Sequence, residues 1–342
     1  MHLPVPRGEL SRALINALLC DPSGEYAEYL ATAAEERLAA TTNVLDDGDL
    51  QLSLFVLYEL HYRGFAEVDD HWEWNPGLIS VRAQIEEAFE QELRKAAGPL
   101  PSVAPSSSKV AEALFALAAN DDGPSVSKFI QRKANAAQAR EFLILKSIYQ
   151  LKEADPHTWA IPKLQGRAKA AMVEIQADEY GNGQLPRMHS ELFRQTMRGM
   201  GLRDDFGAYV DRIPAVTLAA VNMISLFGMH RRLRGAITGH LALYEMTSSI
   251  PQAAYARGFR RLGYESPVTD YFDEHVEADA VHEQIAGRDL AGGLAESEPE
   301  LVPDILFGAY AAAAVDALAG VKYLDAWEAG RSALHAGAGV TA

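Results

Sequence analysis

The stretch DYFDEHVEADAVHEQIA, residues 270–286, carries the pattern that decides the fold class of this chain. The pattern predicts an α-helix on which His275, Asp279 and His282 stand at i, i+4 and i+7. At that spacing the three side chains share one stripe of the helix. Imidazole and carboxylate ligands together suit iron or manganese better than calcium or magnesium, so the stripe is a candidate metal site.

A second interpretation of the same stretch is the solvated polar face of an acidic helix. Asp273, Glu274, Glu277 and Glu283 also lie on it and are ordinary residues for such a face. The stripe alone does not separate the two interpretations, so other parts of the chain must decide between them.

Helical patterns extend over most of the 342 residues. Ala, Leu and Glu are abundant, runs of β-branched residues are few, and no strand-like alternation persists over several turns. Gly and Pro stand at the expected ends of the periodic segments. The sequence therefore predicts an all-α protein with helices at 9–40, 50–60, 79–97, 109–119, 126–154, 163–179, 188–200, 204–210, 214–227, 233–248, 250–262, 268–284 and 300–328, the second of them capped by a turn at 46–49.

The stretch GPLPSVAPSSSK, residues 98–109, is the clearest break in this pattern. It is either a linker or an ordered surface loop, because Pro, Ser and Gly are common in both. We expect it to separate a helical accessory region, 1–97, from a metal-binding bundle, 110–328. The Gly- and Ala-rich end, 329–342, is expected to be a flexible tail.

The formal net charge of −16 disfavours nucleic acid and an acidic membrane surface as partners. Cys20 is the only cysteine, which excludes an intrachain disulfide and a thiolate cluster. The first residues lack a signal-peptide pattern, and the longest apolar stretches, 215–229 and 305–320, are shorter than a membrane span. We expect a soluble cytoplasmic protein.

Two further segments place acids or histidines where metal ligands could be. Glu245 lies in an otherwise apolar run, where burying a lone carboxylate is costly unless it is paired or binds a metal. Glu179 ends one predicted helix and His189 opens the next, after a Gly- and Pro-containing loop. The plain alternatives are a helix-end surface acid for Glu179 and a polar residue near a helix start for His189. Glu174 and Asp178 compete with Glu179 for the same role.

Taken together, residues 151–193 and 244–283 resemble the heme-oxygenase-like diiron oxidases and oxygenases, which are iron-containing redox enzymes. The resemblance covers roughly residues 126–320. Its most specific part is an ordered pattern: Glu and then His around a Gly-rich loop, a lone Glu, and finally His-x3-Asp-x2-His. Residues before 100 match only as accessory helices that some members carry. The chain has no Glu-x-x-His element of the ferritin-like type, which favours the heme-oxygenase-like arrangement.

The resemblance implies a heme-oxygenase-like helical bundle with an N-terminal helical extension. It also implies a set of metal ligands that includes four carboxylates, which would balance the charge of two divalent ions. One carboxylate would then have to bridge the two ions, with Glu179 as the first guess. Some members carry one more ligating Glu upstream, which corresponds to Glu153. The implied ligands are Glu153, Glu179, His189, Glu245, His275, Asp279 and His282.

The implied activity is that of a non-heme diiron enzyme that activates O₂, with manganese as an alternative metal. Members of the family carry out N-oxygenation, hydroxylation or oxidative C–C cleavage on small amines, amino acids or fatty acids. We expect a small-molecule substrate, an external electron donor and a homodimer. The alternative is a non-catalytic helical binding protein with a structural or single metal site; heme binding is a third option.

Overall fold

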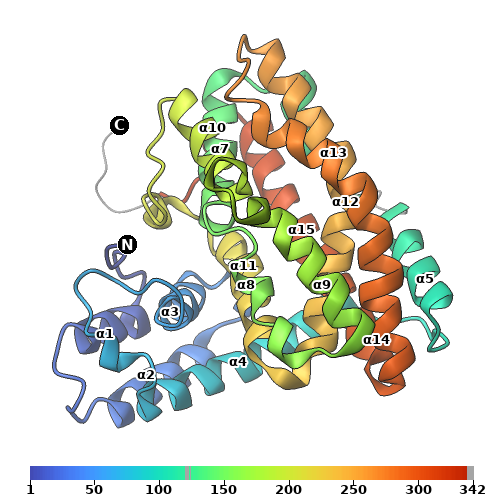
Figure 1. The fold of residues 1–342 in the computed structure, drawn as a ribbon. Helices are drawn as coiled ribbons and strands as arrows, with labels where there is room; N and C mark the ends of the chain where they lie inside the picture. Colours follow the sequence, from blue (N-terminus) through green and yellow to red (C-terminus); the bar gives the residue numbers. More distant parts are fainter. Residues whose placement is uncertain (120–122, 124, 337–342) are drawn as a thin grey trace.

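The computed structural model describes residues 1–336 apart from 120–122 and 124. Residues 337–342 lie outside the described part, and within α13 (Asp270–Gln284) the backbone of residues 277–281 is described but their side chains are not. Over the described residues the chain is helical, and no β-strand is found among them. The predicted all-α fold is therefore confirmed (Figure 1).

The N-terminal region contains α1 (Glu9–Leu18), α2 (Ala27–Ala40), α3 (Gly48–Glu59) and α4 (Pro76–Ala97). These helices lie together at the lower left of Figure 1, beside the rest of the molecule. Asp47 begins α3, because its side chain accepts hydrogen bonds from the backbone N–H groups of Asp49 and Leu50. The turn and helix cap predicted at 46–49 are thus confirmed.

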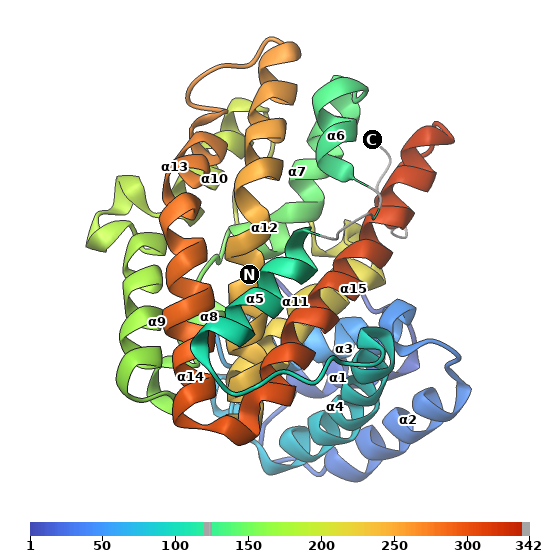
Figure 2. The same cartoon turned by 90° about the vertical axis from the view of Figure 1, so that its right-hand side faces the viewer.

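The bundle is arranged around α12, which packs against α13, α15 and α6 (Figure 2). After Gln284 the helix of α13 continues through a π-helical segment, Ile285–Ala291, directly into α14. The remaining helices are α5 (Ser107–Ala119), α6 (Val126–Arg132), α7 (Ala136–Gln150), α8 (Asp155–Thr158), α9 (Gly166–Glu179), α10 (His189–Gly199), α11 (Ala215–Met229), α12 (Arg234–Arg261), α14 (Gly292–Ser297) and α15 (Val302–Glu328).

Two of the predicted helices are divided in the structure. The segment 126–154 breaks into α6 and α7, because Asn135 and Gln138 form a reciprocal capping box that starts a new helix. The segment 9–40 divides into α1 and α2 around a turn that contains Pro22 and Gly24. In both cases local capping or turn chemistry divides a segment that the sequence predicts as one helix.

Two other predictions fail in different ways. The sequence predicts separate helices at 233–248 and 250–262, but α12 is continuous with Pro251 inside it. Pro251 lacks a backbone N–H, and the packing of α12 on its neighbours retains the helix despite this loss. The predicted helix at 204–210 is a series of turns, in which Gly207 adopts a φ of 80° that no α-helix contains.

A shared hydrophobic cluster connects the N-terminal helices with the bundle. It includes Leu54 of α3 and Phe89 of α4 together with Phe227 of α11 and Leu306 of α15. The segment 99–106, which contains no helix, runs along this cluster, and Leu100 and Val103 are packed against it. The division into an accessory region and a bundle stays a prediction, although the two parts bury apolar surface against each other.

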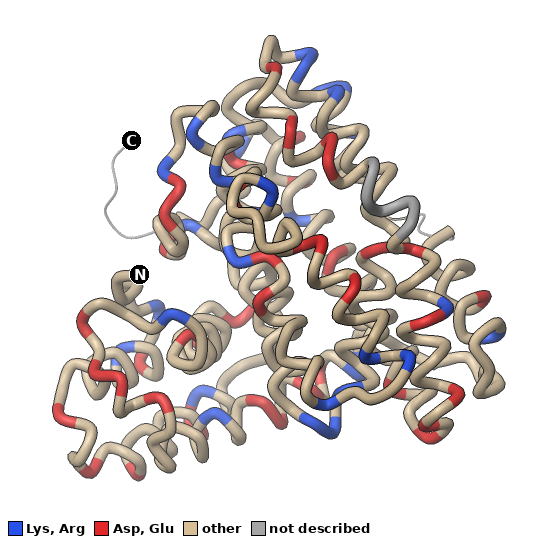
Figure 3. The backbone as a smooth tube through the Cα atoms, in the orientation of Figure 1, with Lys and Arg blue, Asp and Glu red and all other residues tan. Residues whose placement is uncertain are grey.

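The segment 299–328, which contains α15, is long and apolar enough to cross a membrane, and its most apolar 18-residue window has a mean hydropathy of 1.5. The apolar segment is thus longer than the 305–320 read from the sequence. However, 56% of its most apolar window is buried inside the protein, against α12, α4 and α11. Burial of this kind is usual for a helix in the core of a folded protein. Lys and Arg residues are interspersed with Asp and Glu along the backbone in Figure 3.

The described part of the C-terminal tail contacts the bundle. The backbone N–H of Ala333 donates to the carboxylate of Glu141 at 2.9 Å, and that of His335 donates to the carbonyl of Arg212 at 2.8 Å. The predicted flexibility of 329–342 stays a prediction, since its last six residues lie outside the described part.

Candidate metal centre

The structure brings together the six predicted ligands whose side chains it describes. They come from five separate places in the chain, so the fold and not local sequence assembles them. Glu153 lies in the turn after α7, Glu179 is the last residue of α9, His189 is the first residue of α10, Glu245 lies in α12, and His275 and His282 lie in α13.

These side chains form two groups that could each hold a metal ion. The first, called here the Glu153 subsite, consists of Glu153, Glu179, His189 and His275. The second, the Glu245 subsite, consists of Glu179, Glu245 and His282. Within each subsite one nitrogen or oxygen per residue lies within 4.8 Å of all the others. Glu179 belongs to both subsites.

In the Glu153 subsite each of the two imidazole rings faces a carboxylate. His189 Nδ1 lies 2.9 Å from Glu179 Oε2, and His275 Nε2 lies 3.8 Å from Glu153 Oε1. The two rings are adjacent, with centroids 4.3 Å apart. Glu179, His189 and His275 are buried, and the Glu153 side chain is 10% exposed. In the Glu245 subsite, His282 Nδ1 lies 3.5 Å from Glu245 Oε2, and both side chains are buried.

The seventh predicted ligand, Asp279, lies one turn before His282 on α13, but its side chain is outside the described residues. The competitors named for the role of Glu179 are elsewhere. Glu174 is exposed on α9. Asp178 contacts the outer nitrogen of His282 instead of joining either subsite.

Hydrogen bonds fix which nitrogen each histidine of α13 turns inward. His275 Nδ1–H donates to the carbonyl of Tyr271 at 2.8 Å, which leaves Nε2 toward Glu153. His282 Nε2–H donates to Asp178 Oδ2 at 2.9 Å, which leaves Nδ1 toward Glu245. Metal-binding histidines are usually oriented in this way by an acceptor on their other nitrogen.

Sequence reasoning gave neither Asp178 nor Tyr271 this orienting role. The Tyr271 hydroxyl also donates to Glu153, with 2.9 Å to both carboxylate oxygens. Tyr271 precedes His275 by one helical turn, so the position was available as a signal. Asp178 is adjacent to Glu179, but which of two neighbouring acids faces inward depends on packing.

The charges of the centre perturb one another strongly. Burial acts to raise the pKa of Glu179. The neighbouring His189, His275 and His282 have the larger, opposite effect and lower this pKa to about 2. Burial acts to lower the pKa of His282, but Glu245 and Asp178 raise it to about 9. Burial raises the pKa of Glu245, against the opposing effect of His282. Such opposed shifts in one cluster are typical of functional sites.

The residues fit a pair of divalent metal ions. His189 Nδ1 and His282 Nδ1 are buried and have no hydrogen-bond partner among the described residues, although each faces a carboxylate. Buried polar atoms left in this way call for an explanation, and an ion between nitrogen and carboxylate provides one. The described donors are three carboxylates and three imidazoles, a set suited to iron or manganese.

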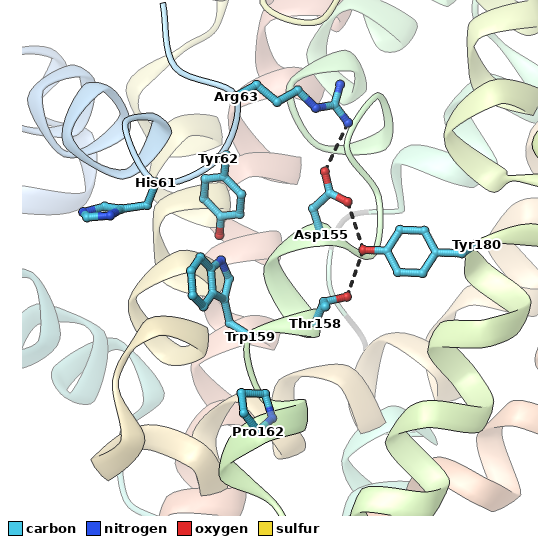
Figure 4. Close-up of a pocket in the computed structure, with 8 residues that line it drawn as sticks. All are labelled: His61, Tyr62, Arg63, Asp155, Thr158, Trp159, Pro162 and Tyr180. Atoms are coloured by element: carbon cyan, nitrogen blue, oxygen red, sulfur yellow. Dashed lines mark hydrogen bonds and ion pairs between the residues drawn. The ribbon is translucent and has the colours of Figure 1, made fainter. Parts of the chain in front are cut away.

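A pocket of about 470 Å³ borders the segments that carry two of these acids (Figure 4). Its lining includes Asp155, two residues after Glu153, and Tyr180, which follows Glu179. Asp155 accepts hydrogen bonds from the Tyr180 hydroxyl at 2.9 Å and from Arg63 at 3.1 Å. Trp159, Tyr62, His61, Thr158 and Pro162 complete the lining.

Comparison with known proteins agrees with this geometry. A family model described as iron-containing redox enzyme matches residues 140–317, a range that includes all seven predicted ligands. A nitrosourea synthase from Streptomyces achromogenes subsp. streptozoticus is 27% identical over 173 residues. That alignment covers 50% of this chain and 36% of the relative, so the chain spans about a third of the relative's length. The chain belongs to the family of iron-containing redox enzymes, which confirms the resemblance and the heme-oxygenase-like fold expected from the sequence.

Proposed function

We propose that this oxidoreductase is a non-heme diiron oxidase or oxygenase that activates O₂ and acts on a small organic substrate. The observation that supports two ions is that Glu179 belongs to both subsites. A carboxylate has two oxygens and can contact an ion with each. The Glu153 and Glu245 subsites would each hold one ion, with Asp279 as a proposed further ligand.

The chain's own residues would bind the metal ions, hold the ligand side chains in position and limit the access of water. Three buried or nearly buried carboxylates offset much of the charge of two divalent ions. Tyr271 and Asp178 hold the rings of His275 and His282 with one nitrogen inward. Burial of His189, Glu179 and Glu245 limits access of water. Ferrous iron bound here would supply electrons and open coordination positions for reduction of O₂.

The substrate class rests on the comparison. The relative is a nitrosourea synthase, and the nitroso group of a nitrosourea carries an oxygen atom on nitrogen. We therefore favour N-oxygenation of an amine or amino acid, with hydroxylation or oxidative C–C cleavage of an amino acid or fatty acid as alternatives. An external electron donor, a cytoplasmic location and a homodimer complete the proposal.

The proposal is tested by metal analysis and by rapid kinetics. Protein loaded with ferrous iron should hold about two irons per chain and give a transient visible absorbance band on mixing with O₂. His275→Ala and His282→Ala should each lose iron while their helical circular dichroism is retained. Full iron occupancy in both variants would contradict the ligand assignment.

The same measurements separate the alternatives. Zinc or no metal in the purified protein, with no reaction toward O₂, would indicate a binding protein with a structural or single metal site. A Soret band after reconstitution with heme would indicate heme chemistry in place of a dinuclear centre.

A further inference from the structure

A fully buried ion pair joins the N-terminal region to the turn that carries Glu153. Lys152 Nζ contacts the carboxylate of Glu59, at the end of α3, and the two residues are 1% and 0% exposed. Lys and Glu are almost never this buried unless they are paired. The proposed chemistry uses neither residue, so the pair calls for a separate explanation.

The surroundings of the lysine give the pair a defined position. The ammonium of Lys152 lies over three aromatic rings, with 4.1 Å to the ring centroid of Tyr62, 5.2 Å to that of Phe206 and 5.6 Å to that of Phe55. The second oxygen of Glu59 has no hydrogen-bond partner among the described residues. Lys152 is thus the hydrogen-bond partner that the described residues provide for the Glu59 carboxylate.

The turn next to this lysine has a backbone that needs outside support. Ala154 adopts a φ of 73°, in the left-handed region that residues other than glycine rarely enter. Such a conformation persists only where its surroundings hold it. Gln176 of α9 supplies part of the support by donating a hydrogen bond to the Ala154 carbonyl at 2.8 Å.

The N-terminal region contacts this turn on both sides of Glu153. Glu59 pairs with Lys152, the residue before Glu153. Arg63 donates a hydrogen bond of 3.1 Å to Asp155, two residues after Glu153. Figure 4 shows this second link, with Arg63 above Asp155 and Tyr180. The carboxylate of Glu153 is held separately, by the hydroxyl of Tyr271. Its backbone and its side chain are therefore fixed by different parts of the fold.

We infer that the N-terminal region supports the metal centre: Glu59, acting through Lys152, positions Glu153 for the ion of the Glu153 subsite. The inference rests on the proposed function. Glu59 and Lys152 are positioning residues, since neither side chain belongs to a subsite. An ion pair inside an aromatic box fixes the position of the turn more narrowly than an apolar contact, which can slide.

The test compares Glu59→Gln with the double variant Glu59→Gln/Lys152→Met. The single variant leaves a buried ammonium without its counter-charge and is expected to lose stability. The double variant removes both charges and should recover much of that stability. Glu86→Gln is the matched control: Glu86 is a buried acid of the same region that binds Tyr58 and His230.

Two measurements report on the centre without using activity. The first is Mn²⁺ titration followed by electron paramagnetic resonance, which distinguishes two coupled ions from one isolated ion. The second is amide hydrogen exchange of residues 151–155 in metal-free protein. Wild type and Glu86→Gln should bind two coupled ions. Glu59→Gln and the double variant should keep one ion, bind the second about 10-fold more weakly or worse, and exchange faster at 151–155.

A double variant with wild-type stability, two tightly bound coupled ions and wild-type exchange at 151–155 would overturn the inference, because the pair would then serve folding alone. A wild-type protein that binds fewer than two Mn²⁺ ions would count against the proposed function instead. In that case the exchange measurement, which needs no metal, still decides whether Glu59 holds the turn.

Discussion

His282 and Asp178 are joined by a hydrogen bond of 2.9 Å between Nε2 and Oδ2, and this bond determines which nitrogen of the imidazole points into the interior. The ring therefore presents Nδ1 to Glu245, at 3.5 Å from its Oε2. The Asp178 side chain is 45% exposed, whereas that of His282 is 2% exposed. Asp178 is thus the outer member of a chain of contacts that leads from solvent to the Glu245 subsite.

Replacing Asp178 with Ala should weaken metal binding without unfolding the protein. The ring of His282 would lose the acceptor that fixes its orientation, and loss of such partners typically lowers metal affinity about 10- to 100-fold. Titration with Fe²⁺ or Mn²⁺ measures the change. Glu174→Ala is the control, since Glu174 is an exposed acid one turn earlier on α9. Equal affinities for the two variants would argue against an orienting role for Asp178.

Removing Glu179 should have a larger effect on metal content than removing Glu245. Glu179 belongs to both subsites, whereas Glu245 belongs to one. We expect Glu179→Ala to lose both ions and Glu245→Ala to retain about one, at the Glu153 subsite. Elemental analysis after anaerobic loading and desalting gives the stoichiometry. Retention of one ion in Glu179→Ala would show that the carboxylate is not shared.

Replacing Tyr271 with Phe should affect the Glu153 subsite selectively. The variant keeps the aromatic ring, which packs 5.0 Å from Phe193, but loses the hydroxyl that donates to Glu153. A hydrogen bond to a charged group contributes about 1.5–3 kcal/mol. We expect a loss of about that size in the unfolding free energy of metal-free protein and weaker binding of one of the two ions.

Tyr255→Phe is the control for this prediction, because Tyr255 packs 5.9 Å from Phe272 and lies in neither subsite. Urea unfolding and Mn²⁺ titration of both variants provide the comparison. If both lost stability equally and both kept two ions, the bond between Tyr271 and Glu153 would have no part in metal binding.

The combined contribution of His157 and His282 to the stability of the metal-free protein should be greatest near pH 6.5. Burial lowers the pKa of His157 to about 4. Between pH 6.5 and 4 this histidine is therefore protonated in the unfolded chain but not in the folded chain, so stability falls as the pH is lowered. Despite the opposing effect of burial, Glu245 and Asp178 raise the pKa of His282 to about 9. Between pH 6.5 and 9 the folded chain keeps a proton that the unfolded chain releases, and stability falls with base.

Urea unfolding in the presence of a chelator measures both limbs of this curve. The shift of His157 corresponds to about 3 kcal/mol, at about 1.4 kcal/mol per pKa unit. His157→Asn should flatten the acid limb, and His282→Asn should flatten the basic limb. A variant of His157 with an unchanged acid limb would show that this residue does not contribute to the acid sensitivity.

Sequence periodicity was sufficient for the fold class but not for every helix boundary. The i, i+4, i+7 stripe of α13 and the apolar run of α15 can each be recognised from the residues of that helix alone. In contrast, the continuity of α12 through Pro251 depends on the helices packed around it, and the break before α7 depends on one capping box. Local pattern alone cannot weigh such contacts.

The candidate site shows the same limit. His275 and His282 could be placed on one helical face, and Glu179 and His189 could be placed on either side of one loop. The link from Glu59 to Lys152 joins residues that are 93 positions apart, and Glu59 lies in an apolar helix with no metal-ligand pattern. Long-range partnerships of this kind arise from packing, which the sequence of one chain does not reveal. The part of Asp279 stays a prediction.

The common core of α3, α4, α11 and α15 also has a practical consequence. The segment that matches the family model begins at residue 140, but its helices share their core with helices that come before that residue. A protein trimmed to the matched segment would expose the apolar faces of α11 and α15 to water and aggregate. We therefore expect the unit that folds on its own to extend beyond the segment that the family model matches.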